Sequence, residues 1–153
     1  MDFSNIIILD IEASGFSDES YPVEIAWVSL DKTFHDSFLV KPDEDWSYWD
    51  EMSQYIHGLC RSVLQLGISP QDSAERLNKI LLDKQVYSDA VQWDTFWIDR
   101  LYQKTDQKRD WQIIDIREIY DNYDLSYVNP GEMHRALSDA DAIANSLLEF
   151  LSS

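Results

Sequence analysis

Short apolar runs rich in β-branched residues recur along this chain between polar segments. The run at residues 6–11 has the composition of a buried strand. The runs at 23–30 and 34–40 are separated by Asp31-Lys32-Thr33, whose length and polarity predict a hairpin connection. With two shorter segments further along, the predicted strands are residues 6–11, 23–30, 34–40, 86–87 and 111–116.

Other segments have the apolar spacing of helices. Ser69 followed by Pro70 has the pattern of an N-cap with proline at the first helical position. The predicted helices are residues 51–60, a segment that starts at Ser69-Pro70 and carries Leu77, Ile80 and Leu81 on one face, 93–103 and 135–151. Three strands with a hairpin, followed by strands alternating with helices, predict an α/β layer fold with a mixed sheet.

Two of the predicted helices carry an acid at the head of an apolar face. A buried, unpaired carboxylate is costly, so it persists where a cation or a donor compensates its charge. An acid in the first turn of a helix is also stabilised by free N–H groups and by the helix dipole, and this explanation stays open for either helix alone. The two apolar faces are Asp94, Trp97, Ile98, Leu101 and Asp139, Ile143, Leu147, Phe150, and the polar ones are Thr95, Asp99, Gln103 and Asp141, Asn145, Glu149.

A third pair of acids lies at the end of the first predicted strand. Residues two apart in a strand project from the same face, so Asp10 and Glu12 lie side by side while Ile11 points away. Two carboxylates this close repel each other unless a cation lies between them, and oxygen-rich sites of this kind suit Mg²⁺ or Mn²⁺. The pattern Asp-x-Glu is common by chance, so it indicates a metal site only together with other acids.

Length and composition predict one domain spanning residues 1–153, because 44% hydrophobic residues suffice for one core at this length. The single cysteine, Cys60, excludes an internal disulfide. The chain begins with an acidic segment and a short apolar run, which does not fit a signal peptide. No run approaches the roughly 18 apolar residues of a membrane span. We therefore expect a soluble, cytoplasmic protein without membrane contacts.

The net charge of the chain is not that of a typical nucleic-acid-binding protein. Asp and Glu total 29 against 12 Lys and Arg, which gives a formal net charge of −17. Nucleic-acid binders usually have a basic face. Either the protein never contacts nucleic acid, or its phosphate contacts run through divalent cations and a few basic groups. The basic cluster of Lys104, Lys108 and Arg109 fits a solvated turn, and the aromatic residues of the predicted loop at 41–50, which either stack on bases or fill the core, are Trp46, Tyr48 and Trp49.

Taken together, three segments resemble the motifs of the DEDD superfamily of exonucleases, and in particular its DEDDh branch, which includes proofreading exonucleases and ribonuclease T-like enzymes. All three occur in the order of the family and span residues 10 to 139. The third is the most specific, since it places a histidine five residues before an aspartate. The segments are Ile7-Ile8-Leu9-Asp10-Ile11-Glu12-Ala13-Ser14-Gly15, then Tyr87-Ser88-Asp89-Ala90 through Trp93-Asp94-Thr95-Phe96-Trp97, and His134-Arg135-Ala136-Leu137-Ser138-Asp139-Ala140.

The resemblance implies an RNase H-like fold, a mixed five-stranded sheet flanked by helices, and hydrolysis of phosphodiester bonds from a 3′ end. It implies that Asp10, Glu12 and Asp139 bind two Mg²⁺ or Mn²⁺ ions directly, while Asp94 acts through water. In such sites two metals about 3.5–4 Å apart activate the attacking water and stabilise the leaving oxygen. His134 would be the general base, since histidine exchanges protons near neutral pH and the segment after Pro130-Gly131 offers a loop that moves. Substrate contacts are implied for Ser14, Gly15, His57 and Arg135.

The sequence departs from the family pattern at two positions. Ser14 stands where threonine is more usual. Asp89 stands near the place of an asparagine, five rather than four residues before Asp94, and so competes with Asp94 as the acid of the second motif. We favour Asp94 because of its helix face. His57, in Ile56-His57-Gly58-Leu59, has an alternative explanation as an exposed residue that closes a short helix before the glycine.

The leading hypothesis is therefore a metal-dependent 3′→5′ exonuclease acting on single-stranded or short RNA or DNA. The motifs do not separate RNA from DNA, and the oligomeric state stays open, a homodimer included. One alternative is a non-catalytic accessory or protein-binding module that retains the exonuclease fold. Another is an enzyme for very short oligonucleotides or nucleotide phosphates.

Overall fold

A five-stranded mixed sheet forms the centre of the computed structural model, which describes residues 2–121, 123 and 134–153. Three strands form an antiparallel meander, and two more continue the sheet in parallel beyond β1. The strand order is β3-β2-β1-β4-β5, and the strands are β1 (Ile6–Ala13), β2 (Pro22–Ser29), β3 (His35–Leu39), β4 (Gln85–Ser88) and β5 (Ile113–Asp115). This confirms the predicted mixed sheet and the hairpin at residues 31–33.

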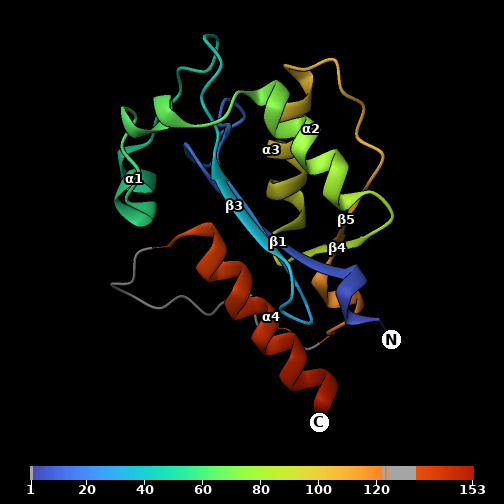
Figure 1. Cartoon of the computed structure of the whole chain (residues 1–153). Helices are drawn as coiled ribbons and strands as arrows, with labels where there is room; N and C mark the ends of the chain where they lie inside the picture. The colour runs from blue at the N-terminus through green and yellow to red at the C-terminus, as the bar shows by residue number, and fades with distance from the viewer. Residues whose placement is uncertain (1, 122, 124–133) are drawn as a thin grey trace.

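Helices cover both faces of this sheet (Figure 1). α2 and α3 pack on one face and α4 on the other, while α1 lies near one end. The helices are α1 (Glu51–His57), α2 (Pro70–Leu81), α3 (Val91–Gln103) and α4 (Ala136–Ser152), and short 3₁₀ turns span Phe3–Asn5, Val63–Leu66 and Ile116–Glu118. Among the helices of the described residues, none is long and apolar enough to cross a bilayer.

The alternation of side chains along β1 divides the interior into two cores. Ile7, Leu9 and Ile11 belong to the core under α2 and α3. Ile6 and Ile8 belong to the core under α4. Because side chains two residues apart share a face, Asp10 and Glu12 continue the side of β1 that α4 covers. The predicted orientation of Ile11, away from the two acids, is confirmed.

The two helices with acids at the head of an apolar face pack as their spacing predicts. In α3, Trp97, Ile98 and Leu101 are buried, and in α4, Ile143 and Leu147 are buried. Asp94 and Asp139 each lie in the first turn of their helix. They differ in environment, because Asp94 is only 1% exposed whereas the side chain of Asp139 is 33% exposed.

Several helix boundaries follow from local chemistry. Ser69 caps α2 as predicted, since its Oγ accepts a hydrogen bond of 3.1 Å from the Asp72 N–H. The prediction that the preceding helix reaches Cys60 is wrong. α1 ends at His57 because Gly58 adopts the left-handed conformation, with φ of 74°, that terminates helices.

The aromatic residues of the loop at 41–50 contribute to the core. Trp46 is buried and stacks on Tyr21, with 5.2 Å between ring centroids. Tyr48 and Trp49 are partly buried and pack against the same core. Of the two explanations that the sequence left open, the core explanation holds for Trp46.

Candidate active site

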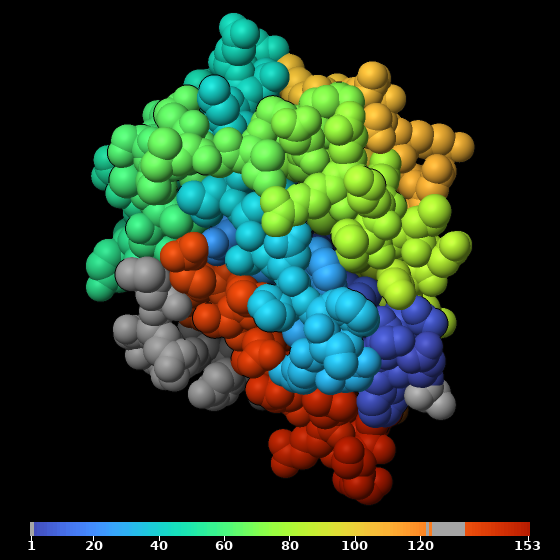
Figure 2. Space-filling view, viewed as in Figure 1, coloured from blue at the N-terminus to red at the C-terminus, as the bar shows by residue number. Residues whose placement is uncertain are grey.

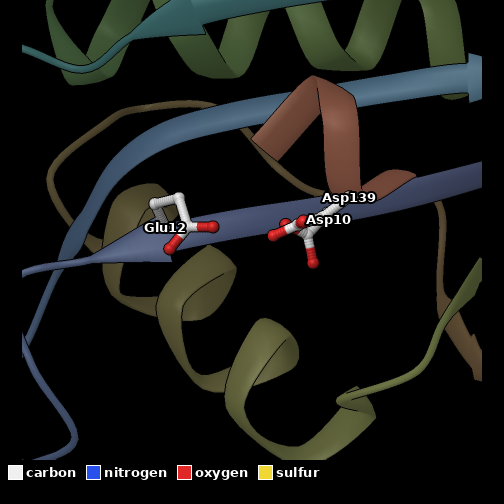
Figure 3. Close-up of side chains that lie close together, drawn as sticks. All are labelled: Asp10, Glu12 and Asp139. Carbon is white, nitrogen blue, oxygen red and sulfur yellow. The ribbon is translucent and has the colours of Figure 1, made fainter. Parts of the chain in front are cut away.

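Three carboxylates meet where the end of β1 faces the start of α4 (Figure 3). Asp10 and Glu12 project from the strand and Asp139 from the helix. One ligand atom of each residue lies within 4.8 Å of those of the other two. The alternation of the strand and the apolar face of the helix thus bring together three of the four acids predicted to bind metal.

Burial and mutual repulsion make this cluster unfavourable without a compensating charge. Asp10 is 9% exposed, and its Oδ2 is buried without a hydrogen-bond partner among the residues that the structure describes. Burial raises its pKa well above the usual range, with further increases from the charges of Asp94 and Glu12. Burial, followed by repulsion from Asp139, raises the pKa of Glu12 to about 9.

A divalent cation fits these observations. The donor set consists of carboxylate oxygens alone, which Mg²⁺ and Mn²⁺ prefer. The unpaired Asp10 oxygen supplies a ligand that nothing else in the described chain uses. A bound dication would also offset the repulsion that raises the pKa values of Asp10 and Glu12.

Asp94 lies close to these acids without joining the group of three. Its Oδ2 accepts a hydrogen bond of 2.5 Å from the hydroxyl of Ser88, the last residue of β4. The same hydroxyl accepts from the Ala90 N–H at 2.9 Å and so links the strand end to the start of α3. Burial raises the pKa of Asp94 well above its usual range. Ser88 was not anticipated from sequence, although it stands within the second motif.

Asp89, the rival acid of the second motif, also lies outside the group of three. Its Oδ2 accepts a hydrogen bond of 3.3 Å from the phenol of Tyr123. Burial raises the pKa of Asp89. The charge of Asp94 raises the pKa of Asp10 more than the charge of Asp89 does. This order favours Asp94 as the closer electrostatic partner of the cluster.

His134 contacts the third carboxylate directly. Its Nδ1 lies 3.4 Å from Asp139 Oδ2. The His134 N–H donates to the carbonyl oxygen of Ile56 at 2.8 Å, which ties the segment before α4 to the end of α1. The predicted mobile loop around Pro130-Gly131 lies outside the described residues.

Arg135, predicted to contact substrate, is engaged by a buried acid. Its guanidinium forms an ion pair with Glu24 of β2, with 2.9 Å from Nε to Oε1. Glu24 is not among the residues predicted from the sequence, because it lies inside the otherwise apolar run 23–30. The available signal was a single acid inside that run.

The other residues predicted at the substrate make contacts within the chain. Ser14 is buried, and its Oγ accepts from the Tyr21 N–H at 3.1 Å. A Cβ on Gly15 would lie 2.6 Å from the Cε1 of Tyr48, so a larger residue there requires the tyrosine ring to move. Substrate contacts of Ser14, Gly15, His57 and Arg135 stay predictions.

His57 closes α1 but is buried, so the idea that it is exposed is wrong. Its ring packs edge-on against Trp49, with 5.9 Å between ring centroids. Its Nδ1 accepts a hydrogen bond of 3.0 Å from the Leu59 N–H. Burial lowers the pKa of His57, which favours a neutral ring.

An exposed aromatic surface adjoins two of the motifs and was not anticipated. Phe16 directly follows Gly15, is 64% exposed and packs edge-on against Trp93 at 5.4 Å between ring centroids. Trp93 in turn directly precedes Asp94 in α3. The basic cluster, by contrast, is paired within the chain as a surface turn would be, through Lys104–Asp43, Lys104–Asp45, Lys108–Asp110 and Arg109–Asp99.

Comparisons with known proteins place the fold. No family model and no curated protein matches the sequence. Among solved structures, apo exonuclease I matches with a TM-score of 0.69 at 13% identity, over 95% of this chain and 42% of that chain. Exonuclease I from E. coli matches with TM-scores of 0.60 in complex with a dT13 oligonucleotide and 0.61 in a zinc-bound complex with single-stranded DNA. Both matches are at 14% identity and cover 75% of this chain and 28% of that chain.

This chain thus spans less than half the length of the exonuclease I chains that it matches. The likeness concerns the fold and covers nearly all of this chain in the apo structure. Together with the mixed five-stranded sheet and its flanking helices, it confirms the predicted architecture, and the chain has the RNase H-like fold found in exonuclease I.

Proposed function

We propose that this protein is a metal-dependent 3′→5′ exonuclease of the DEDDh type that hydrolyses phosphodiester bonds in single-stranded or short RNA or DNA. The observation that carries the proposal is the group of Asp10, Glu12 and Asp139, with ligand atoms within 4.8 Å of one another and the imidazole of His134 beside Asp139. The fold shared with exonuclease I supports a nuclease over other hydrolases.

In this proposal the acids hold two Mg²⁺ or Mn²⁺ ions. Asp10, Glu12 and Asp139 would bind them directly, and Asp94, set back against Ser88, would act through water. When bound, such ions lower the pKa of an attacking water and stabilise the departing 3′ oxygen. The protein's own contribution is to hold the carboxylate oxygens together against their repulsion.

His134 would accept the proton of the attacking water. With Nδ1 turned to Asp139, the acceptor would be Nε2. The contact with Asp139 orients the ring, and the backbone bond to Ile56 holds the residue at the edge of the site. A general base placed in this way contributes about 10²–10⁴-fold to a rate.

The distribution of positive charge favours short or single strands over long duplex. Most basic residues are already paired with acids of the same chain, so few remain to contact phosphates. The exposed ring of Phe16 offers a stacking surface that does not depend on charge. The paired residues, seven of the twelve Lys and Arg, are Lys32, Arg76, Lys104, Lys108, Arg109, Arg117 and Arg135.

Incubation of the purified protein with 5′-labelled single-stranded RNA and DNA tests the proposal. In Mg²⁺ or Mn²⁺ we expect a ladder of products shortened from the 3′ end, and no cleavage in EDTA. Substrates with a blocked 3′ end should persist, which separates exonuclease from endonuclease activity. Intact RNA and DNA with both metals would refute the proposal.

A metal titration distinguishes the enzyme from a non-catalytic module with the same fold. Binding of a dication between ionised carboxylates raises the free energy of unfolding, so Mn²⁺ should raise the melting temperature. A melting temperature that neither Mg²⁺ nor Mn²⁺ changes would instead favour the module, which suits the strongly acidic surface.

A further inference from the structure

Glu24 is a buried acid in the middle of an apolar strand. It is 3% exposed and lies in β2, where its Cα pairs with that of Glu12 in β1. A buried carboxylate beside another carboxylate is costly unless donors compensate it. Packing within the sheet does not require an acid at this position, since an apolar side chain would fill it at lower cost.

Both oxygens of Glu24 are bound by the segment that begins α4. Oε1 accepts from Arg135 Nε and from the Ala136 N–H, each at 2.9 Å. Oε2 accepts from Arg135 Nε at 3.1 Å and pairs with Arg135 Nη2. The N-cap residue of α4 is Arg135, which makes no capping bond with its own side chain. Glu24 therefore caps this helix from a neighbouring strand.

The segment fixed by Glu24 carries two groups of the proposed active site. His134 directly precedes Arg135, and the Asp139 N–H donates to the Arg135 carbonyl oxygen at 3.0 Å. The other two carboxylates of the group of three, Asp10 and Glu12, project from β1, the strand paired with β2. The contacts of Glu24 thus connect the two halves of the site.

We propose that Glu24 is a positioning residue for the proposed nuclease reaction, which holds the start of α4 so that His134 and Asp139 face Asp10 and Glu12. This inference rests on the proposed function. Without the carboxylate, the first turn of α4 loses its cap and its tie to the sheet. Displacements of about 1 Å of reacting groups lower rates on the order of 10²-fold.

A second ion pair provides a matched control on the same helix. Lys32, in the β2–β3 turn, binds the carboxylate of Asp141, so it also ties α4 to the β2–β3 hairpin. Figure 2 shows the hairpin and α4 packed side by side. Asp141 belongs to the half-exposed side of the helix, away from the group of three acids.

The experiment compares Glu24→Gln, Arg135→Lys and the control Asp141→Asn with the wild type. Arg135→Lys keeps the positive charge but loses the bidentate hydrogen bonding of the guanidinium. The measurements are kcat and KM on a single-stranded oligonucleotide, calorimetric titration with Mn²⁺ alone, and the melting temperature. The Mn²⁺ titration reports on the carboxylates without any need for turnover.

We expect Glu24→Gln to lower kcat on the order of 10²-fold, with KM changed less than about 3-fold. Its affinity for Mn²⁺ should fall about 10–100-fold, as for groups that orient metal ligands. Arg135→Lys should show smaller changes in the same direction. Asp141→Asn should keep kcat and Mn²⁺ affinity within about 2-fold of wild type, because an exposed ion pair contributes little.

The inference would be overturned if Glu24→Gln had a lower melting temperature but the kcat and Mn²⁺ affinity of the wild type. Glu24 would then be a purely structural residue. If Glu24→Gln does not fold, Arg135→Lys decides, and wild-type kcat and Mn²⁺ affinity in that variant would overturn it. If the wild type cleaves nothing but Glu24→Gln still weakens Mn²⁺ binding, the proposed function fails while the positioning role stands.

Discussion

Residues of the proposed active site and residues outside it should differ in the effect of their substitution on nuclease activity. Asp10 and His134 belong to the proposed active site, whereas Asp141 pairs with Lys32 outside it. We expect Asp10→Ala and His134→Ala to lower nuclease activity at least on the order of 10²-fold, as expected when a metal ligand or general base is lost. Asp141→Ala should keep most of the activity. Equal losses in all three, measured on a labelled oligonucleotide, would contradict the assignment by helix face.

The raised pKa of Glu12 predicts a stability cost in the metal-free protein. Its pKa is about 9 in the folded chain against 4.5 for an ordinary glutamate, so the folded state favours the protonated acid. That stabilisation is present below about pH 4.5 and is lost as pH rises toward 9. In EDTA at pH 8, Glu12→Gln should therefore melt higher by ~2–4 °C, the shift expected for about 1 kcal/mol.

Thermal melts of the wild type and Glu12→Gln between pH 5 and 9 check this prediction, with roughly equal melting temperatures expected at the acid end of that range. Adding Mg²⁺ should reduce or reverse the difference at pH 8, because a bound cation stabilises the ionised form. A wild type that melts higher than the variant at pH 8 in EDTA would contradict the prediction.

Single residues were predictable where a local period fixes their direction. Asp10 and Glu12 follow from the two-residue repeat of a strand, and Asp139 from the face of its helix. The role of Glu24 could not be predicted from the sequence, because its partner, Arg135, lies 111 residues away and only the fold brings them together. The helical period favoured Asp94 over Asp89, but it could not give their hydrogen-bond partners, Ser88 for Asp94 and Tyr123 for Asp89.

At the scale of elements, the end of β1 lies unusually close to the loop at residues 41–50. A Cβ on Gly15 would meet Tyr48 Cε1 at 2.6 Å and Asp50 Cβ at 3.0 Å. Gly15→Ala should therefore lower the free energy of unfolding by about 1–3 kcal/mol, the usual cost of overpacking. Urea denaturation measures the change. In a Tyr48→Ala background the same substitution should cost clearly less, and an unchanged cost there would rule out the clash as its origin.

The type of each helix and strand was predictable from the sequence, but the residues at which each begins and ends were less so. Every strand and every α-helix of the described chain overlaps a segment predicted from the sequence, and the apolar pattern supported the longer ones because it reflects burial. The boundaries of helices and strands depend on tertiary contacts that the apolar pattern does not reveal. The last strand, predicted at 111–116, is Ile113–Asp115, since Trp111 instead packs in the core and donates through Nε1 to Tyr102 and Asn78.

For the whole molecule, the scarcity of unpaired cations predicts weak salt dependence. Five of the twelve Lys and Arg form no ion pair with a described acid, and they are Lys41, Arg61, Lys79, Lys84 and Arg100. Each phosphate contact contributes roughly −0.7 to the slope of log K against log salt for a single strand. Because five such contacts together give a slope of about −3.5, we expect a slope no steeper than that at saturating Mg²⁺.

Titration of a fluorescent single-stranded oligonucleotide at several KCl concentrations, with the cleavage-deficient His134→Ala variant, measures this slope. A slope near −5 would contradict the prediction, because it would require that basic residues paired with acids of the chain also contact phosphates. A matched duplex should bind more weakly than the single strand.

The overall architecture was predictable because three motifs in a fixed order indicated one superfamily, and the fold followed from it. Composition alone pointed the other way, since a net charge of −17 is atypical of nucleic-acid enzymes. In the structure, the mutually repelling acids of the candidate site are few, and most of the other acids lie at the surface or pair with basic residues.

The cap that β2 provides for α4 also orders events during synthesis. His134 and Asp139 leave the ribosome after all five strands, and Glu24 receives its partners only when the helix that follows them docks. Of the three acids grouped at the candidate site, Asp10 and Glu12 are thus synthesised well before Asp139. The proposed active site is therefore complete only after α4 has been synthesised and has docked on the sheet.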